Sequence, residues 1–277
     1  MNRGVQPDEN CARYATRPAA HNAVMWRALR IAILLLVLVL AAGTTLLDRI
    51  RTTDWDQPLR VGLFPVSADG RRATADYMAG LGEAQFAAIG DFLEREAARY
   101  DLGVDRPVDI TLHEPVTEAP PLLPRDASVF TRVAWSLRLR WYNWRMGGDS
   151  GEQIRIYVLY HDPAVTQEVP HSLGLQKGLV GVVYAYADDS MDGQNNIVIA
   201  HELLHTVGAT DKYDFETLQP VYPAGYAEPL REPRYPQARA EIMAGRRMVS
   251  ATRAEMPLDL EDVAIGTATA AEIRWFE

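Results

Sequence analysis

The chain has 277 residues, of which 48% are hydrophobic and 23% charged, a composition typical of a folded globular protein rather than of a disordered or collagen-like chain. Its formal net charge of −9 lacks the basic excess of nucleic-acid-binding proteins, so no nucleic-acid partner is expected. The single cysteine, Cys11, excludes an intramolecular disulfide and a thiolate cluster, so any metal ligands must be His, Asp or Glu side chains.

Residues 31–47 form the first predicted element, an apolar run without a charged side chain that starts just after Arg30. Extended to residues 28–47, the segment spans about 30 Å as a helix, which matches the hydrocarbon core of a bilayer. Arginines outnumber acidic residues in the preceding tail, residues 1–27, so the positive-inside tendency places that tail in the cytoplasm. We therefore expect a single-pass anchor in the cytoplasmic membrane, with the rest of the chain on its periplasmic or extracellular side.

The alternative for this segment is a cleavable signal peptide, because Ala41, Ala42 and Gly43 are small enough for a processing site. The long tail before the apolar run favours an uncleaved anchor. Residues 48–58 then form a predicted polar linker. Residues 59–277 are long enough for one domain with a core of its own.

Strand and helix patterns alternate in the first half of this domain and indicate a layered α+β fold. Residues 59–66, 108–112 and 153–160 have the apolar, β-branched content of strands. Between the first two strands, apolar residues recur at helical spacing, in the set Phe86, Ile89, Leu93, Ala97 and Tyr100. The proline-rich segment 114–124 is expected to be a loop within the domain.

A second helix follows this loop, with tryptophans and arginines interleaved. Its apolar stripe consists of Phe130, Val133, Ala134, Leu137, Trp141 and Trp144. A surface of this kind can contact lipid headgroups or nucleic acid. Because Trp141 and Trp144 share the apolar stripe, we favour the alternative that the stripe is buried in the core.

Residues 196–211, NIVIAHELLHTVGATD, contain the strongest chemical signal in the sequence, the pattern H-E-x-x-H. On a helix, His201 and His205 lie one turn apart on the same face, so both imidazoles can bind one zinc ion. Glu202 is offset by about 100° around the helix axis, so its carboxylate can hold a water molecule at the metal without being a ligand.

A catalytic zinc site normally has three protein ligands and one open position, so a third ligand is required. Gly208 can end the helix in a left-handed conformation and turn the chain back toward the metal. Asp211 follows three residues later and is then within reach. Glu241 and Glu228 are the alternatives, because another group of zinc peptidases takes its third ligand from a downstream glutamate. The glycine turn favours Asp211.

The segment HELLHTVGATD resembles the extended zinc-binding signature of the metzincin peptidases, H-E-x-x-H-x-x-G-x-x-H/D, in the variant that ends in aspartate, as in snapalysin. The resemblance implies a twisted mixed sheet with an active-site helix. It also implies that His201, His205 and Asp211 bind zinc and that Glu202 is the general base. Metzincins carry a methionine in a turn beneath the metal, and Met243 is the matching candidate.

Two further features of the family have several candidates in this sequence. Some metzincins have a tyrosine two residues after the methionine, where this chain has Gly245. The tyrosines that could stabilise the oxyanion instead are Tyr213, Tyr222, Tyr226 and Tyr235. Metzincin-like folds also pair an extended peptide with an edge strand, for which residues 178–187 are the candidate. An interior strand with glycines at bulges is an equally good interpretation of that segment.

Together these features predict a membrane-anchored zinc endopeptidase in which Glu202 takes a proton from the zinc-activated water. The expected cofactor is Zn²⁺ and the expected partner is a peptide or protein substrate, while the sequence defines no oligomeric state. One alternative is a non-catalytic, peptidase-like module that binds an envelope protein or a peptide. Another is a hydrolase of non-peptide amides. The complete motif favours catalysis, because a binding module has no use for Glu202.

Overall fold

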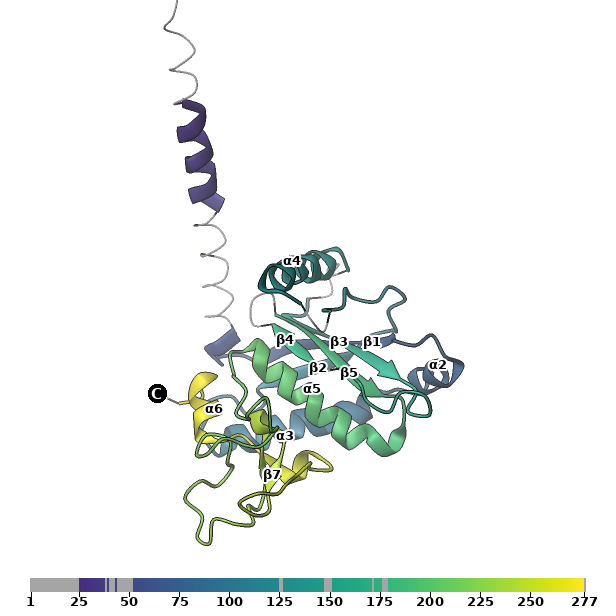
Figure 1. Cartoon of the computed structure of the whole chain (residues 1–277), viewed down its shortest axis with the longest axis vertical. Coiled ribbons are helices and arrows are strands. Elements are labelled where there is room, and N and C mark those ends of the chain that lie inside the picture. Colours follow the sequence, from purple (N-terminus) through teal and green to yellow (C-terminus); the bar gives the residue numbers. More distant parts are fainter. Residues whose placement is uncertain are drawn as a thin grey trace, which may run out of the picture. The chain divides into compact units, whose positions relative to one another are not determined.

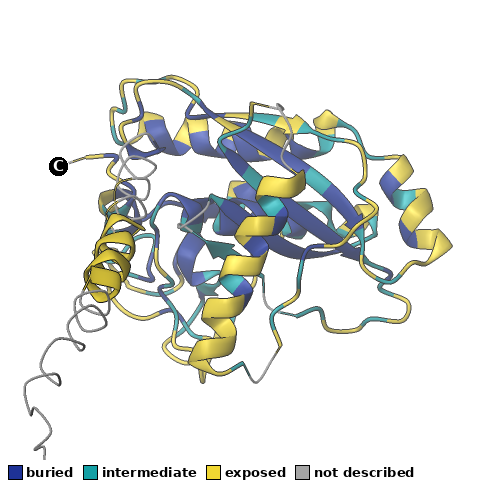
Figure 2. Cartoon of the chain, turned by 90° about the horizontal axis from the view of Figure 1, so that it is seen from above, coloured by how far each residue is buried: buried dark blue, intermediate teal, exposed yellow. Residues whose placement is uncertain are grey.

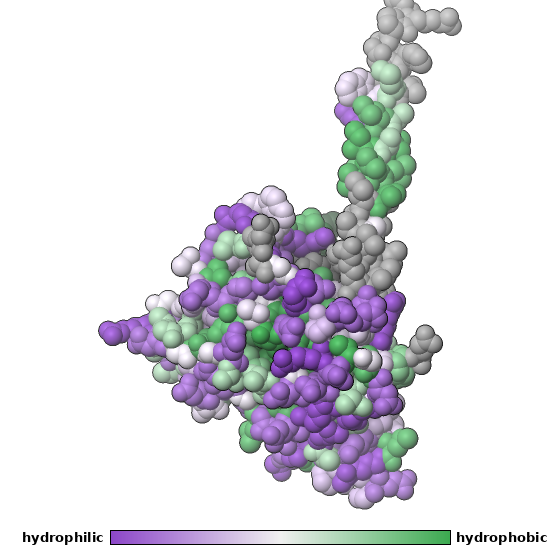
Figure 3. Space-filling view, turned by 180° about the vertical axis from the view of Figure 1, so that it is seen from behind, coloured by the Kyte–Doolittle hydropathy of each residue, from purple (hydrophilic) through white to green (hydrophobic). Residues whose placement is uncertain are grey.

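The computed structural model describes residues 25–37, 39, 43, 52–124, 127–146, 151–170, 172–175 and 179–276. The chain divides into two compact units, Met1–Asp48 and Arg49–Glu277. In the first unit, residues 25–37 are helical and their large apolar side chains are exposed (Figure 3).

The predicted tail at residues 1–27 and the predicted membrane segment at residues 28–47 lie partly outside the described residues. Within the ranges that the structure describes, we find no helix with both the length and the hydrophobicity needed to cross a bilayer.

A five-stranded sheet forms the centre of the second unit, in the order β2-β1-β3-β5-β4 (Figure 1). Its parallel strands are β1 (Leu59–Ser67), β2 (Val108–Leu112), β3 (Ile154–His161) and β5 (Val180–Tyr186). The short strand β4 (Leu173–Leu175) pairs antiparallel with β5 at one edge. The sheet is therefore mixed, and the predicted strands are confirmed to within a residue or two at their ends.

Helices cover both faces of this sheet (Figure 1). The helices α3 (Ala87–Ala98) and α5 (Asp192–Thr206) pack on one face, and α4 (Val129–Met146) packs on the other. Alternate side chains of β3 point to opposite faces, so Ile156 belongs to the core beside α3 and α5, whereas Tyr157 packs beside α4. Burial on both faces explains the continuous apolar sequence of this strand.

The remaining elements are short. They are α2 (Arg72–Ala79), η1 (Glu83–Phe86), η2 (Asp189–Met191), β6 (Ala240–Glu241), η3 (Ile242–Ala244), β7 (Arg247–Met248), β8 (Ala254–Glu255), η4 (Leu260–Asp262), β9 (Val263–Ala264) and α6 (Thr267–Glu272). The segment 114–124 contains no helix or strand, as predicted, and its Val116 forms an isolated bridge with Val66 of β1.

The prediction that the apolar stripe of α4 is buried is wrong. The helix is present, but Trp141 is 58% and Trp144 76% exposed. The side chains that pack on the sheet are instead Trp135, Leu139 and Tyr142. Figure 2 shows α4 crossing in front of the sheet with its outer surface exposed. The helix thus has two apolar faces, and only one of them reaches the core.

The predicted linker at residues 48–58 also needs correction, because part of it belongs to the core. Trp55 is 5% exposed and packs edge-on against Trp275, with ring centroids 5.8 Å apart. Its indole N–H donates a hydrogen bond of 2.7 Å to the carbonyl oxygen of Ile273. The core residues of the second unit lie between Trp55 and Trp275, so residues 49–277 contain their own complete core.

The strand predicted at residues 178–187 is an interior strand. It forms β5, which pairs with β3 on one side and with β4 on the other. The hypothesis that this strand offers a free edge to a peptide is therefore wrong, and the alternative interpretation of an interior strand is confirmed.

Candidate metal centre

Helix α5 carries the H-E-x-x-H motif and ends as the sequence predicts. Gly208, just past its end, has a φ of +112°. The N–H of Gly208 donates to the carbonyl oxygen of His205 at 3.2 Å, and that of Ala209 donates to Leu204 at 3.0 Å. These two bonds define a Schellman turn, which reverses the chain directly after the motif.

Three side chains converge beside this turn. His201, His205 and Asp211 each offer one ligand atom, and these atoms all lie within 4.8 Å of one another. The Nε2 atom of each histidine is 3.2 Å from Oδ1 of Asp211. The two imidazole rings are nearly perpendicular, with centroids 4.7 Å apart. The structure therefore brings together the three residues that the sequence identifies as ligands.

Backbone carbonyl groups orient both imidazoles. Nδ1 of His201 lies 2.9 Å from the carbonyl oxygen of Ile242, and Nδ1 of His205 lies 2.8 Å from that of Ala209. A carbonyl oxygen can only accept a hydrogen bond, so each Nδ1 carries a proton. In the neutral imidazole Nε2 then keeps its lone pair, and this is the nitrogen that faces Asp211.

Glu202 is buried beside these ligands and is in close contact with the edge strand. Its side chain is only 4% exposed, and Oε2 has no hydrogen-bond partner in the described part of the chain. A Cβ added at Gly174 would lie 2.4 Å from the carbonyl oxygen of Glu202 and 3.1 Å from Oε2. Gly174 therefore allows β4 to pass directly over α5. This contact could not be predicted from the sequence, because β4 is too short for a periodic pattern.

The turn that contains Met243 supports the site from below. Met243 is fully buried in η3, and Gly245 ends this turn with a φ of +68°. The carbonyl oxygen of Ile242 accepts from His201, and that of Met243 accepts from the N–H of Lys212 at 2.9 Å. The turn thus orients one histidine and holds the residue that follows the aspartate.

The two alternative glutamates are engaged elsewhere. The carboxylate of Glu241 is buried and accepts hydrogen bonds from Ala244 N–H, Gly266 N–H and the Thr269 hydroxyl. Glu228 forms an ion pair with Arg231 at 3.0 Å. Of the three candidates for the third ligand, the described structure places only Asp211 with the histidines.

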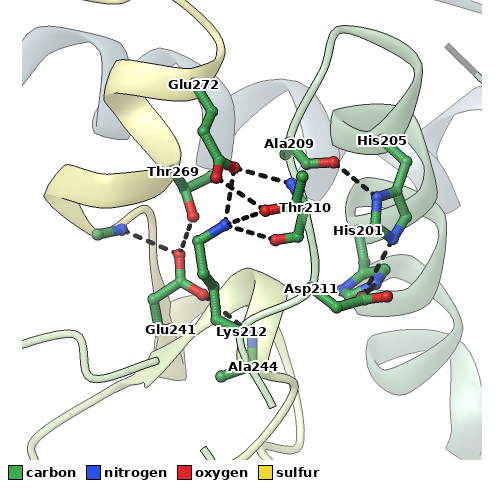
Figure 4. A network of polar contacts seen from close by, with 11 residues as sticks. His201, His205, Ala209, Thr210, Asp211, Lys212, Glu241, Ala244, Thr269 and Glu272 are labelled. Atoms are coloured by element: carbon green, nitrogen blue, oxygen red, sulfur yellow. Dashed lines mark hydrogen bonds and ion pairs between the residues drawn. The ribbon is translucent and has the colours of Figure 1, made fainter. Parts of the chain in front are cut away.

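A second polar network lies beside Asp211, on the side away from His201 and His205 (Figure 4). The buried Lys212 donates from Nζ to the carbonyl oxygen of Thr210 at 2.6 Å and to Oε2 of Glu272 at 2.7 Å. Glu272 also accepts from the N–H and the hydroxyl of Thr210, at 2.8 and 2.7 Å. Because Thr210 and Lys212 flank Asp211, these hydrogen bonds connect residues 210–212 to Glu272 of α6. No local sequence pattern indicates this network.

The contacts within the cluster shift its pKa values. Burial opposes a positive charge on His201, but its contacts with Asp211 and the charge of Glu202 prevail and raise the pKa of the imidazole to about 9. Burial also opposes the charge on Asp211, yet both histidines together hold its pKa well below the usual range. Burial raises the pKa of Glu202, although the nearby histidine charges oppose this shift.

Among the candidate tyrosines, Tyr213 is influenced by the charges of the site. Burial, followed by the charges of Asp211 and Glu202, raises the pKa of Tyr213 to about 12. Tyr226 and Tyr235 instead bond to each other through their hydroxyl groups at 3.1 Å. Tyr222 lies under the guanidinium group of Arg234, at 4.2 Å.

Comparisons with known proteins assign no family to this chain. No family model matches it, and no curated protein matches it either. Among solved structures, the chain is similar to wild-type OgpA from Akkermansia muciniphila, with a TM-score of 0.36 and 12% identity over 78% of this chain. The chain spans 59% of the length of that protein. So distant a likeness says nothing about the activity.

Proposed function

We propose that this chain is a zinc-dependent endopeptidase, anchored in the cytoplasmic membrane by residues 28–47, with its catalytic domain on the periplasmic or extracellular side. The observation that carries the proposal is the convergence of His201, His205 and Asp211 beside the buried carboxylate of Glu202. Two imidazoles and one carboxylate are a typical ligand set of catalytic zinc sites.

The spacing of the three ligand atoms supports metal binding. Atoms that lie about 2.0–2.1 Å from a tetrahedral zinc ion are about 3.3 Å from each other. The Nε2 atoms of both histidines are 3.2 Å from Oδ1 of Asp211. An oxygen at this spacing from two imidazole nitrogens fits a metal ligand.

Zinc at this position would supply a Lewis acid that lowers the pKa of water and polarises a substrate carbonyl group. Glu202 directly follows the first ligand in α5, so its carboxylate lies beside the ligands rather than among them. It accepts a proton from the attacking water and passes that proton to the leaving amine. The raised pKa of Glu202 makes it a stronger base than an exposed glutamate.

Tyr213 is the proposed donor to the negative charge that develops on the substrate oxygen. Because its pKa is about 12, the phenol keeps its proton at neutral pH and can donate a hydrogen bond. An extended peptide would pair with β4, since β4 lies at the edge of the sheet and in contact with α5.

The proposed activity is tested by the substitution Glu202→Gln in the full chain, purified in detergent. Zinc content is measured by mass spectrometry, and hydrolysis is measured with fluorescein-labelled casein. We expect hydrolysis to fall by at least about a hundredfold, because a general base is lost, while zinc content stays unchanged. Glu228→Gln is the matched control and should change neither quantity. Full activity of Glu202→Gln would contradict the assigned role, and a zinc-loaded parent chain that is inactive toward casein and peptides would favour the non-catalytic module.

The proposed anchor is tested separately by membrane fractionation. The full chain should remain in the membrane pellet after alkaline carbonate extraction, at its full mass. Recovery of a shortened, extractable chain would instead indicate a cleaved signal peptide.

A further inference from the structure

Helix α4 presents an apolar face that no described part of the second unit covers. Its exposed large side chains are Val129, Phe130, Val133, Leu137, Trp141 and Trp144, each more than half exposed. At about 100° per residue, these positions fall within an arc of about 120°. The buried residues Trp135, Leu139 and Tyr142 project from the opposite side of the helix. Figure 2 shows this outer face of α4 pointing away from the sheet.

The buried side holds α4 in this orientation. The indole N–H of Trp135 donates to the carbonyl oxygen of Pro121 at 2.7 Å. The hydroxyl of Tyr142 donates to the backbone carbonyl oxygen of Glu118. The ring of Tyr142 also packs edge-on against Tyr157 of β3, with centroids 5.2 Å apart. Turning the outer face inward would break these contacts, so the exposure of Trp141 and Trp144 is fixed by the fold.

The charges of α4 are all positive, although the chain carries a net charge of −9. The helix contains Arg132, Arg138, Arg140 and Arg145 and no acidic residue. At helical spacing, Arg140 lies within the apolar arc, and Arg132 and Arg138 each lie about 60° outside one of its two borders. Among the described residues, Arg145 is the only one of the four in an ion pair, with Glu118. An apolar stripe bordered by arginines is complementary to a surface that is apolar inside and anionic outside.

We propose that α4 is an interfacial helix that docks the second unit onto a membrane containing anionic phospholipids. Phe130, Leu137 and Trp141 enter the region between headgroups and acyl chains, and the arginines contact the phosphates. This surface belongs to the second unit alone, so the proposal depends neither on the metal centre nor on residues 28–47.

Two other occupants fit this face less well. A second copy would bring its own α4 in a two-fold pairing, and arginines would then face arginines without an acidic partner. Single-stranded nucleic acid needs aromatic platforms for its bases, but Val133 and Leu137 in the middle of the arc are aliphatic.

The test uses residues 49–277, which contain their own core, so residues 28–47 cannot contribute to binding. Binding is measured by cosedimentation with vesicles of equimolar phosphatidylglycerol and phosphatidylcholine, and with pure phosphatidylcholine vesicles. We expect partitioning onto the anionic vesicles and little onto the neutral ones. On binding, tryptophan fluorescence should shift to the blue and be quenched by lipids with brominated chains. Trp141→Glu/Trp144→Glu should abolish cosedimentation with the anionic vesicles.

A charge-matched pair of variants separates this proposal from non-specific attraction. Arg138→Gln/Arg140→Gln should weaken binding by about thirtyfold, because each arginine near an anionic surface contributes about fivefold. Arg72→Gln/Arg253→Gln removes the same charge from exposed sites outside α4 and should leave binding unchanged. Circular dichroism should show that all variants are folded. Equal losses in both pairs would overturn the proposal. So would a dimer that dissociates in the tryptophan variant, or binding of a single-stranded RNA oligonucleotide without binding of vesicles.

Discussion

His201 connects the binding of a metal ion to pH. Its pKa of about 9 means that a proton occupies this imidazole at neutral pH, through its contacts with Asp211 and Glu202. Zinc must displace that proton, so zinc affinity should rise by about tenfold per pH unit between pH 7 and 8 and level off above about 9. Competition with a chelator of known zinc affinity, measured at each pH, checks this dependence. An affinity that does not change between pH 7 and 9 would contradict it.

The raised pKa of His201 also makes the stability of chelator-treated protein depend on pH. The folded protein binds the proton on His201 more tightly than the unfolded chain, whose histidines have a pKa of about 6.5. The resulting stabilisation is complete below pH 6.5 and is lost as the pH rises through about 9. Urea denaturation of chelator-treated protein should therefore show falling stability over this window. Zinc-loaded protein should not show the loss, because the proton is already absent.

Lys212 holds the backbone around Asp211, the proposed third ligand, through its contacts with Thr210 and Glu272. Lys212→Met should lower the free energy of unfolding by about 2–3 kcal/mol, because it leaves the carboxylate of Glu272 without its cation. Zinc affinity should fall by about tenfold, since Asp211 loses a neighbouring support. Denaturation and zinc titration measure both effects. Arg231→Met breaks the exposed pair with Glu228 and should cost less than about 1 kcal/mol, with zinc affinity unchanged.

The convergence of the three candidate ligands could be predicted from the sequence, whereas the residues that support them could not. His201, His205, Gly208 and Asp211 lie within one short segment, so helical spacing and a single turn determine how they meet. Lys212 and Glu272 are 60 residues apart, and their contact depends on where α6 packs. A lysine next to a metal ligand gives no local sign that it is buried.

The turn that follows α5 depends on Gly208, which has a left-handed backbone conformation. At a φ of +112°, Gly208→Ala should cost about 1–2 kcal/mol and weaken zinc binding, because the turn sets the direction toward Asp211. Gly90→Ala is the matched control in α3, where an added Cβ meets no atom within 4 Å. It should stabilise the fold by about 0.5–1 kcal/mol without changing zinc affinity. Equal effects of the two substitutions on zinc affinity would contradict the role of the turn.

Helix α4 shows what helical periodicity can and cannot determine. Its existence follows from the apolar spacing, and the structure confirms the helix. The sequence, however, contains two apolar stripes on opposite sides of the helix, and periodicity gives each the same weight. The sheet selects Trp135, Leu139 and Tyr142 because Tyr157 and its neighbours in β3 and β5 face that side. Such a selection is non-local and cannot be read from the helix alone.

The boundary of the second unit lies further toward the N-terminus than the sequence predicts. The polar residues around Trp55 suggest a linker, but the indole packs into the core contributed by the last residues of the chain. Trp55→Ala should lower the free energy of unfolding of residues 49–277 by about 3–5 kcal/mol. Trp144→Ala removes an exposed indole and should change it by less than about 0.5 kcal/mol. Urea denaturation compares the two, and equal costs would contradict the revised boundary.

Zinc stoichiometry tests the proposed centre most directly. Residues 49–277, reconstituted with zinc and then desalted, should hold one zinc ion per chain by mass spectrometry. Asp211→Ala should weaken binding by at least about tenfold and Glu228→Ala should not, because of these two carboxylates Asp211 is the one that lies with both histidines. A folded parent fragment without zinc would contradict the account, as would an Asp211→Ala variant that binds zinc as tightly as the parent.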